Sequence, residues 1–218
     1  MYITSEGIIL KQTKILGGRR MITIFSKNYG KISCGTSITE GGKNKTALAL
    51  RPFTYGRYEL FKGRSAYNIQ GAETIKSYYG IGENIDKYMA ASYALELTDL
   101  VLQEEEPVPA LFNLLHDFFD IIEKRKSAFE TLVVAYRIKL LEPLGLKASD
   151  GMISQGALKE GPDADIIETL KFIENSKLEG LANLALKSEQ ENRLKSLLND
   201  FYAYHLGIEK LKSEGMVL

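Results

Sequence analysis

The hydrophobic pattern of this chain changes its period near residue 80. Before that point, apolar and β-branched residues occur in short, roughly alternating runs, as expected for strands whose side chains point to opposite faces. These runs occupy residues 6–12, 19–26, 31–37, 52–62 and 65–73. A polar segment, Glu40–Lys45, follows the third run as a flexible loop. Five short strands with a longer break after the third favour a small closed barrel such as the OB-fold, with an SH3-like barrel as the alternative.

Beyond residue 80 the apolar residues recur at helical spacing, as in Ile85, Met89 and Tyr93. Helices are predicted over 83–105, 110–125, 128–141, 163–175, 177–186 and 189–206. Ser127 with Glu130 predicts a capping box at the start of the third helix. The glycine-containing segment 146–162 is expected to be an irregular loop. The predicted fold class is α+β with two domains: an N-terminal OB-fold β-barrel over 1–80 and an all-α helical domain over 81–218.

The charges divide the chain at the same place. The net charge is zero, but residues 1–80 carry 13 Lys and Arg against 4 Asp and Glu, a net charge of +9. Residues 81–218 carry 15 against 24, a net charge of −9. Such asymmetry indicates domains that face different partners, with the basic one suited to a polyanion. The alternative is that the charges only keep each domain in solution.

The basic half interleaves cations with aromatic residues. Single-stranded nucleic acid is bound by this combination, in which cations follow the phosphates and exposed rings stack on bases. Alternation places Phe53, Tyr55 and Phe61 on one face of a strand and Tyr58 on the other, without showing which face is outside. The alternative is that half or more of the rings belong to the core. The predicted DNA contacts are Lys11, Arg19, Arg20, Lys31, Lys43, Lys45, Arg51, Arg57, Lys62, Arg64, Tyr29 and Tyr58.

The sequence carries no motif of catalysis or metal binding. His116 and His205 lie in separate predicted helices, and Cys34 is the only cysteine. Nucleophile-elbow, P-loop and dinucleotide-binding patterns do not occur. We therefore expect no enzyme, no cofactor and no metal, with an enzyme acting on RNA or oligosaccharide as a distant alternative. The run Glu104–Glu106 is interpreted as a solvated helix end. A cytoplasmic location is expected, because no signal peptide or membrane-spanning run is found.

Short segments spread over most of the chain form a further pattern. They are EGIILK at 6–11, MITIF at 21–25, YGKIS at 29–33, Pro52-Phe53, YEL at 58–60, Ala72-Glu73, YALEL at 93–97, YHLG at 204–207 and KLKS at 210–213. Together they resemble the bacterial recombination mediator family RecO, although each motif is short and structural rather than catalytic.

The resemblance implies an N-terminal OB-fold followed by a helical domain. It implies binding of single- and double-stranded DNA, annealing of complementary strands, and help for RecA on strands coated by single-strand-binding protein, in DNA repair and homologous recombination. The implied partners are RecR and the acidic C-terminal tail of single-strand-binding protein, and the implied location is the nucleoid. An apolar groove between helices is expected to take that tail, anchored by Arg125, Lys139 and Arg193. A protein-interaction adaptor, whose basic barrel binds an acidic protein, is the competing hypothesis.

The chain departs from the family pattern in two places. Many members carry a four-cysteine zinc element where this chain has the cysteine-free segment 146–162. Structural zinc needs four sulfur or nitrogen ligands, so no zinc is expected here. The tail 214–218 lacks the basic residues that are typical of the family.

Overall fold

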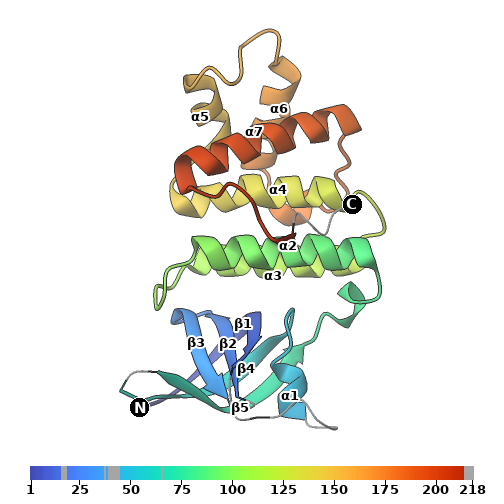
Figure 1. The fold of residues 1–218 in the computed structure, drawn as a ribbon. Helices are drawn as coiled ribbons and strands as arrows, with labels where there is room; N and C mark the ends of the chain where they lie inside the picture. Colours follow the sequence, from blue (N-terminus) through green and yellow to red (C-terminus); the bar gives the residue numbers. More distant parts are fainter. Residues whose placement is uncertain (16–18, 37, 39–44, 65, 214–218) are drawn as a thin grey trace.

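The computed structural model describes residues 1–15, 19–36, 38, 45–64 and 66–213. Its first half is a closed barrel with the strand order β1-β2-β3-β5-β4 (Figure 1). The strands are β1 (Tyr2–Lys14), β2 (Arg20–Ser26), β3 (Gly30–Thr36), β4 (Tyr55–Lys62) and β5 (Tyr67–Lys76). β3 and β5 pair in parallel, and the other neighbours are antiparallel. With the short helix α1 (Lys45–Ala49) between β3 and β4, this is the predicted OB-fold rather than an SH3-like barrel.

The alternation in the sequence becomes the inside and outside of this barrel. Ile9, Ile22, Ile32 and Leu60 point inward and are fully buried, because β-branched and aliphatic side chains fill the interior of a small barrel. β1 is longer than predicted and begins at Tyr2, since its first half pairs with β4. Lys45 opens α1 instead of lying in a loop, and residues 40–44, the rest of that predicted loop, lie outside the described residues.

The second half of the chain is helical, as predicted. Its helices are α2 (Ile85–Val101), α3 (Pro109–Lys124), α4 (Phe129–Leu141), α5 (Ala148–Ser154), α6 (Ala164–Asn175) and α7 (Ser188–Leu206). Short 3-10 turns are η2 (Tyr79–Ile81), η3 (Glu142–Leu144) and η4 (Leu178–Leu181). α2 and α3 lie directly on the barrel, α4 and α7 form the next level, and α5 and α6 are farthest from the strands (Figure 1). The departure expected in the tail 214–218 lies outside the described residues.

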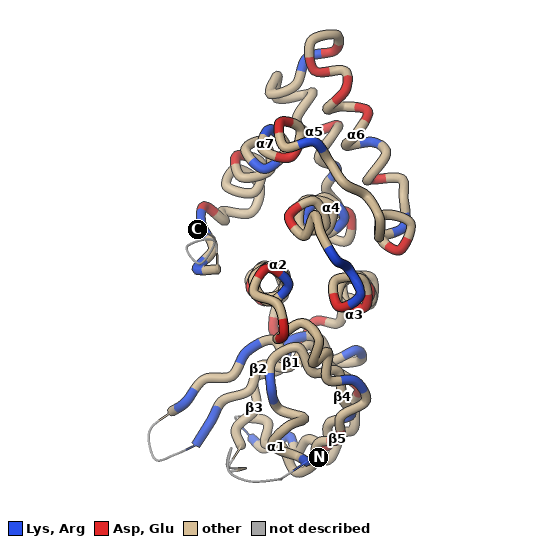
Figure 2. The backbone as a smooth tube through the Cα atoms, turned by 90° about the vertical axis from the view of Figure 1, so that its right-hand side faces the viewer, with Lys and Arg blue, Asp and Glu red and all other residues tan. Residues whose placement is uncertain are grey.

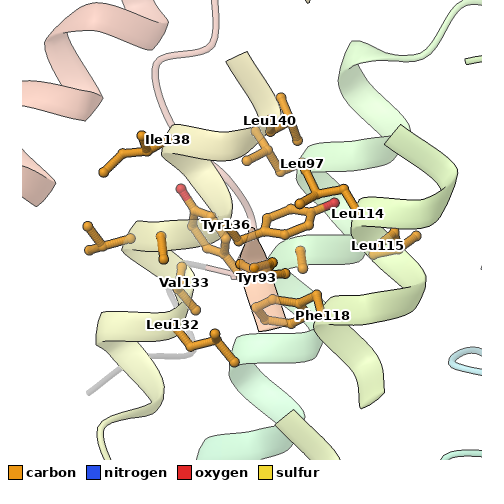
Figure 3. Close-up of a cluster of buried hydrophobic side chains, with 14 of the residues drawn as sticks. Tyr93, Leu97, Leu114, Leu115, Phe118, Leu132, Val133, Tyr136, Ile138 and Leu140 are labelled. Carbon is orange, nitrogen blue, oxygen red and sulfur yellow. The ribbon is translucent and has the colours of Figure 1, made fainter. Parts of the chain in front are cut away.

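α4 is the central helix of this half. Every residue from Thr131 to Ile138 is buried, as expected for a helix surrounded by other elements. The ring of Tyr136 lies between side chains of α2 and α3, near Leu97 and Phe118 (Figure 3). Its hydroxyl is 2.6 Å from Oγ1 of Thr98, which gives the buried phenol a hydrogen-bond partner.

Several expectations for the helical half were wrong at the level of local structure. α4 has no capping box, because its N-cap is Ala128 in a left-handed conformation, without a side-chain cap. Glu130 instead places a carboxylate oxygen 2.7 Å from Nζ of Lys195 on α7. The segment 146–162 is not wholly irregular, because it contains α5, which packs Met152 into the core and places Gly151 against the ring of Phe201.

The helix predicted over 177–186 is only the turn η4. The guanidinium of Arg125 donates to the backbone carbonyls of Ala182 and Leu184. In a continuing helix these carbonyls would accept hydrogen bonds from backbone amides. Here they accept from the Arg125 side chain, and the helix does not continue.

One apolar cluster joins the barrel to the helices, beside a second cluster that fills the barrel interior. Phe25 of β2 packs edge-on against Phe112 of α3, with ring centroids 5.3 Å apart. Phe53, just before β4, lies 5.8 Å from Phe119 in the same way. The predicted boundary at residue 80 falls between β5 and α2, while the buried cluster that contains Ile8 and these rings crosses the seam. The division into two domains stays a prediction.

Candidate nucleic-acid interface

Three lysines of the barrel face acidic groups of the helical half. Nζ of Lys31 donates to the carbonyl of Asp99 at 2.7 Å and is 3.5 Å from that residue's carboxylate. Nζ of Lys62 lies 2.6 Å from the carboxylate of Glu105. Lys76, which was not among the predicted contacts, lies 2.6 Å from the carboxylate of Asp120. We call Lys31, Lys62 and Lys76 the seam cations, because each one pairs across the barrel–helix seam.

The acidic run Glu104–Glu106 is therefore more than a solvated helix end. Its backbone continues the sheet: the amide of Glu105 donates to the carbonyl of Lys31 at 2.9 Å. A Cβ at Gly30, whose φ is +72°, would lie 2.2 Å from the carbonyl oxygen of Glu106, so only glycine permits this approach. Lys31 and Lys62 are thus engaged by the helical half, which the sequence alone did not indicate.

Two predicted arginines also have partners within the barrel. Arg20 is buried, and its guanidinium donates to the backbone carbonyl of Ile38. This corrects the expectation that Arg20 meets a phosphate, because a buried guanidinium that bonds a carbonyl helps hold the chain beyond β3. Arg57 is half-exposed and lies between two carboxylates, 3.6 Å from Glu6 and 3.8 Å from Glu73. Its charge is balanced locally, although its side chain still reaches solvent.

Five predicted cations are exposed and make no ion pair with any residue that the structure describes. They are Lys11, Arg19, Lys45, Arg51 and Arg64. We call them the outer cations. Basic positions mark the free end of the β1–β2 hairpin, which projects away from the helices, whereas acidic positions are scattered along the helices (Figure 2). Lys43 lies outside the described residues.

The aromatic residues divide differently from the prediction. Tyr58 is 1% exposed, and its hydroxyl donates to the carbonyl of Ala49 at 2.9 Å, so its ring is core and is not available for stacking. Tyr29 is half-buried against the barrel core. The exposed rings that the prediction missed include Tyr79 and Tyr88, which are 75% and 43% exposed. Both lie beyond the last strand, where helical spacing alone gave no sign of exposure.

The three cations predicted to anchor a partner's tail bind separate parts of the helical half. Arg125 is buried, and its four contacts are backbone carbonyls, which corrects the expectation that it is open to a partner. Nζ of Lys139 donates to the carbonyl of Glu174 at 2.7 Å and is 13% exposed at its side chain. Arg193 is 47% exposed and lies 3.8 Å from the carboxylate of Asp163, so it is the most accessible of the three.

Groups that could support other chemistry are already engaged in the fold. Burial raises the pKa of the Cys34 thiol to about 12, so at neutral pH it is a buried neutral thiol. His116 packs edge-on against Tyr55, and His205 bonds Gln155. In the described part of the chain, no three His, Cys, Asp or Glu side chains are placed to hold a metal ion. Nor does any described helix combine the length and apolarity of a membrane span.

Comparisons with known proteins agree with this architecture. Residues 1–78 match the family described as recombination protein O N terminal, and residues 82–149 match recombination protein O C terminal. The DNA repair protein RecO of Alkaliphilus metalliredigens is 33% identical over 147 residues, which cover 67% of this chain and 60% of that protein. The RecO of Acetivibrio thermocellus is 27% identical, over 66% of this chain and 57% of that protein.

The RecO of Listeria monocytogenes is 22% identical over 231 aligned positions, which cover 93% of this chain and 89% of that protein. The match to the first two relatives thus spans about three fifths of their length, and the match to the third spans most of it. Both family matches and all three relatives point the same way, and the barrel followed by helices has the order of the two matched regions. The chain belongs to the RecO family.

Proposed function

We propose that this protein is a DNA-binding recombination mediator that acts by binding rather than by catalysis. It binds single- and double-stranded DNA, anneals complementary strands and assists RecA on strands coated by single-strand-binding protein, in DNA repair and homologous recombination, at the nucleoid in the cytoplasm. The observation that carries the proposal is the set of outer cations on an OB-fold barrel, which lack ion pairs with the described residues. Membership of a family whose relatives are named DNA repair proteins supports it.

The outer cations act through the phosphates. Each neutralised phosphate releases condensed counterions, so binding is weakly dependent on sequence and weakens steeply as salt rises. When the protein's cations contact the phosphates of two complementary strands, they reduce the repulsion between the strands. This gives a route to annealing that needs no nucleotide hydrolysis. Stacking of exposed rings on bases adds affinity for single strands.

The helical half suits protein partners, because its net charge of −9 repels DNA. RecR and the acidic tail of single-strand-binding protein are the proposed partners. Arg193 supports a contact with an acidic tail, since its guanidinium is half-exposed at the start of α7. Lys139 would have to release the carbonyl of Glu174 before it could take part.

The test is a fluorescence-anisotropy titration of a labelled single-stranded oligonucleotide with the full chain at several salt concentrations. If about four to six phosphates are neutralised, the log–log slope of affinity against salt is about −3 to −4 on single strands. Reversing Arg19, Lys45 and Arg64 together to Glu is expected to reduce that slope by about 2, because three phosphate contacts are lost. Arg20 is left unchanged, because it is buried.

A matched control reverses Lys171, Lys177 and Lys187 to Glu, which changes the net charge equally on exposed positions of the helical half. The control is expected to keep the slope of the unmodified protein. Equal slopes for the two triple variants would move the DNA site off the outer barrel. If the unmodified chain bound no oligonucleotide at low salt, the proposal would fail, and an acidic protein would become the better candidate for the basic barrel.

A further inference from the structure

A groove runs along one side of the seam between the barrel and the helices. Its larger part, of about 1230 Å³, lies between α1, β5 and η2. A smaller hollow of about 400 Å³ lies between β1, the outer face of α2 and residues 212–213. Pro52, Phe53 and Tyr88 line both hollows, so the two meet at these residues. We call the combined feature the seam groove.

Two exposed tyrosine rings line the seam groove. Tyr79 on η2 is 75% exposed, and Tyr88 on α2 is 43% exposed. The ring of Tyr88 rests edge-on against Phe53, with centroids 5.4 Å apart and planes at 79°, which fixes its orientation while leaving part of it in solvent. A large ring left in water at a concave surface is available to stack on a flat ligand.

Two residues with an unusual backbone conformation lie beside the rings of Tyr79 and Tyr88. Phe53 has φ +65° and Tyr78 has φ +48°, a left-handed conformation that is unusual for bulky side chains. At Tyr78 this turn buries one tyrosine at 2% exposure and turns the next, Tyr79, outward. At Phe53 it sets the ring on which Tyr88 rests. Strained residues of this kind cluster at functional sites, and here two of them line one groove.

The charges of the seam groove favour an anion. Its cations are the outer residues Lys11, Lys45 and Arg51, with Lys212 at the far end. Most of the carboxylates that line it are already engaged: Glu73 by Arg57, Asp99 by Lys31, and Glu96 by the backbone amides of residues 212 and 213. Among the described lining residues, Glu83 is the carboxylate that has neither an ion pair nor a hydrogen bond.

We propose that the seam groove binds single-stranded nucleic acid, with Tyr79 and Tyr88 stacked on unpaired bases and Lys11, Lys45 and Arg51 on the phosphates between them. This inference rests on the proposed function and gives it a base-contacting site. Rings that line a groove reach only bases that are free of a partner strand, because the bases of a duplex are stacked inside it. The tyrosines of the groove therefore select single strands, whereas the outer cations, three of which line the groove, act on any phosphate backbone.

The test compares the full chain with Tyr79→Ala and Tyr88→Ala, singly and together, on three labelled probes: oligothymidine, an abasic strand of equal length, and a duplex. Each substitution is expected to weaken oligothymidine binding at least fivefold, and to change binding of the abasic strand and the duplex less than twofold. Tyr79→Phe and Tyr88→Phe keep the ring and are expected to bind oligothymidine like the unmodified chain. Tyr204→Ala is the matched control, because that ring is 76% exposed on α7, outside the groove.

A second measurement needs no variant. A strand containing 5-bromouracil is irradiated with the unmodified chain, and the adducts are located by mass spectrometry. Adducts at Tyr79 or Tyr88 are expected. Adducts confined to the β1–β2 hairpin, or alanine variants that bind oligothymidine as tightly as the Tyr204→Ala control, would overturn the inference while leaving the proposed function standing. No binding of any probe by the unmodified chain would overturn both.

Discussion

The seam cations and the outer cations belong to the same small barrel but differ in what faces them. Lys31, Lys62 and Lys76 each meet a carboxylate of the helical half. Arg19 and Arg64 are exposed without a described ion-pair partner. The net charge of +9 therefore overstates what the barrel offers to a polyanion. The acidic half neutralises the seam cations, so an approaching nucleic acid would be attracted to the outer cations instead.

The seam itself is held mainly by rings, not by charges. Phe112 is 3% exposed and packs against Phe25 and Tyr55 across the seam. Phe112→Ala removes ring contacts that hold the helical half against the barrel. The carboxylates of that half would then no longer be held opposite the seam cations, and the seam and outer cations would become alike. We expect a loss of about 3–5 kcal/mol in the free energy of unfolding, measured by urea denaturation.

Phe172→Ala is the control for this variant, since that ring is 54% exposed on α6. It is expected to change stability by less than about 0.5 kcal/mol. If both variants unfolded at the same urea concentration, the rings at the seam would not be what joins the two halves.

A single hairpin offers a matched pair of cations. Arg64 is exposed between β4 and β5, whereas Lys62 lies 2.6 Å from the Glu105 carboxylate. Near 0.1 M salt, Arg64→Ala should weaken single-strand binding roughly fivefold, the effect of losing one phosphate contact. Lys62→Ala should weaken it less than twofold, because that charge is already neutralised. Anisotropy titrations of the two variants would contradict the distinction if the losses were equal.

The smallest expected effect is a pH dependence at the seam. Burial works against the charged form of Asp120, but the ammonium of Lys76 outweighs it, so the pKa of Asp120 lies below its usual value. A lowered carboxyl pKa stabilises the fold above the unfolded-state pKa of about 4, and this stabilisation is lost as pH falls through the folded-state pKa. Both side chains are about one-third exposed, so the contribution is at most about 1 kcal/mol.

Lys76→Met should therefore lower stability at pH 7, and the deficit should shrink toward pH 3. Urea midpoints at the two pH values measure it, with Lys177→Met as an exposed control. A deficit that stays constant with pH would assign the role of Lys76 to its 4.4 Å contact with the ring of Tyr78 instead of its ion pair with Asp120.

Much of the fold was predictable because local signals agreed with tertiary needs. Strands β2 and β3, and helices α3, α6 and α7, begin and end within one or two residues of the predicted bounds, since their periodicity matches the face they bury. The errors occurred where a distant group decided the local structure. Arg125 donates to the carbonyls that follow η4. Phe201 packs against α5, which lies in a segment with a weak hydrophobic pattern.

The candidate site was less predictable. Composition located the cations but could not separate Arg20, which is buried, from Arg19, which is exposed beside it in sequence. It could not place Tyr58 inside the barrel, because alternation gives two faces without naming the inner one. Tyr79 and Tyr88 were missed because the sequence shows neither the left-handed turn at Tyr78 that precedes Tyr79 nor the contact of Tyr88 with Phe53.

The sequence by itself determined an OB-fold barrel followed by helices, the opposite charges of the two halves and the family of the chain, because these depend on periodicity, composition and short motifs. The tertiary structure decided which charges and rings remain available. Whether Lys31 meets Asp99 or solvent, and whether a tyrosine is core or surface, depends on elements far apart in the chain that pack together at the seam. Pairing and burial are properties of that packing, and local sequence does not contain them.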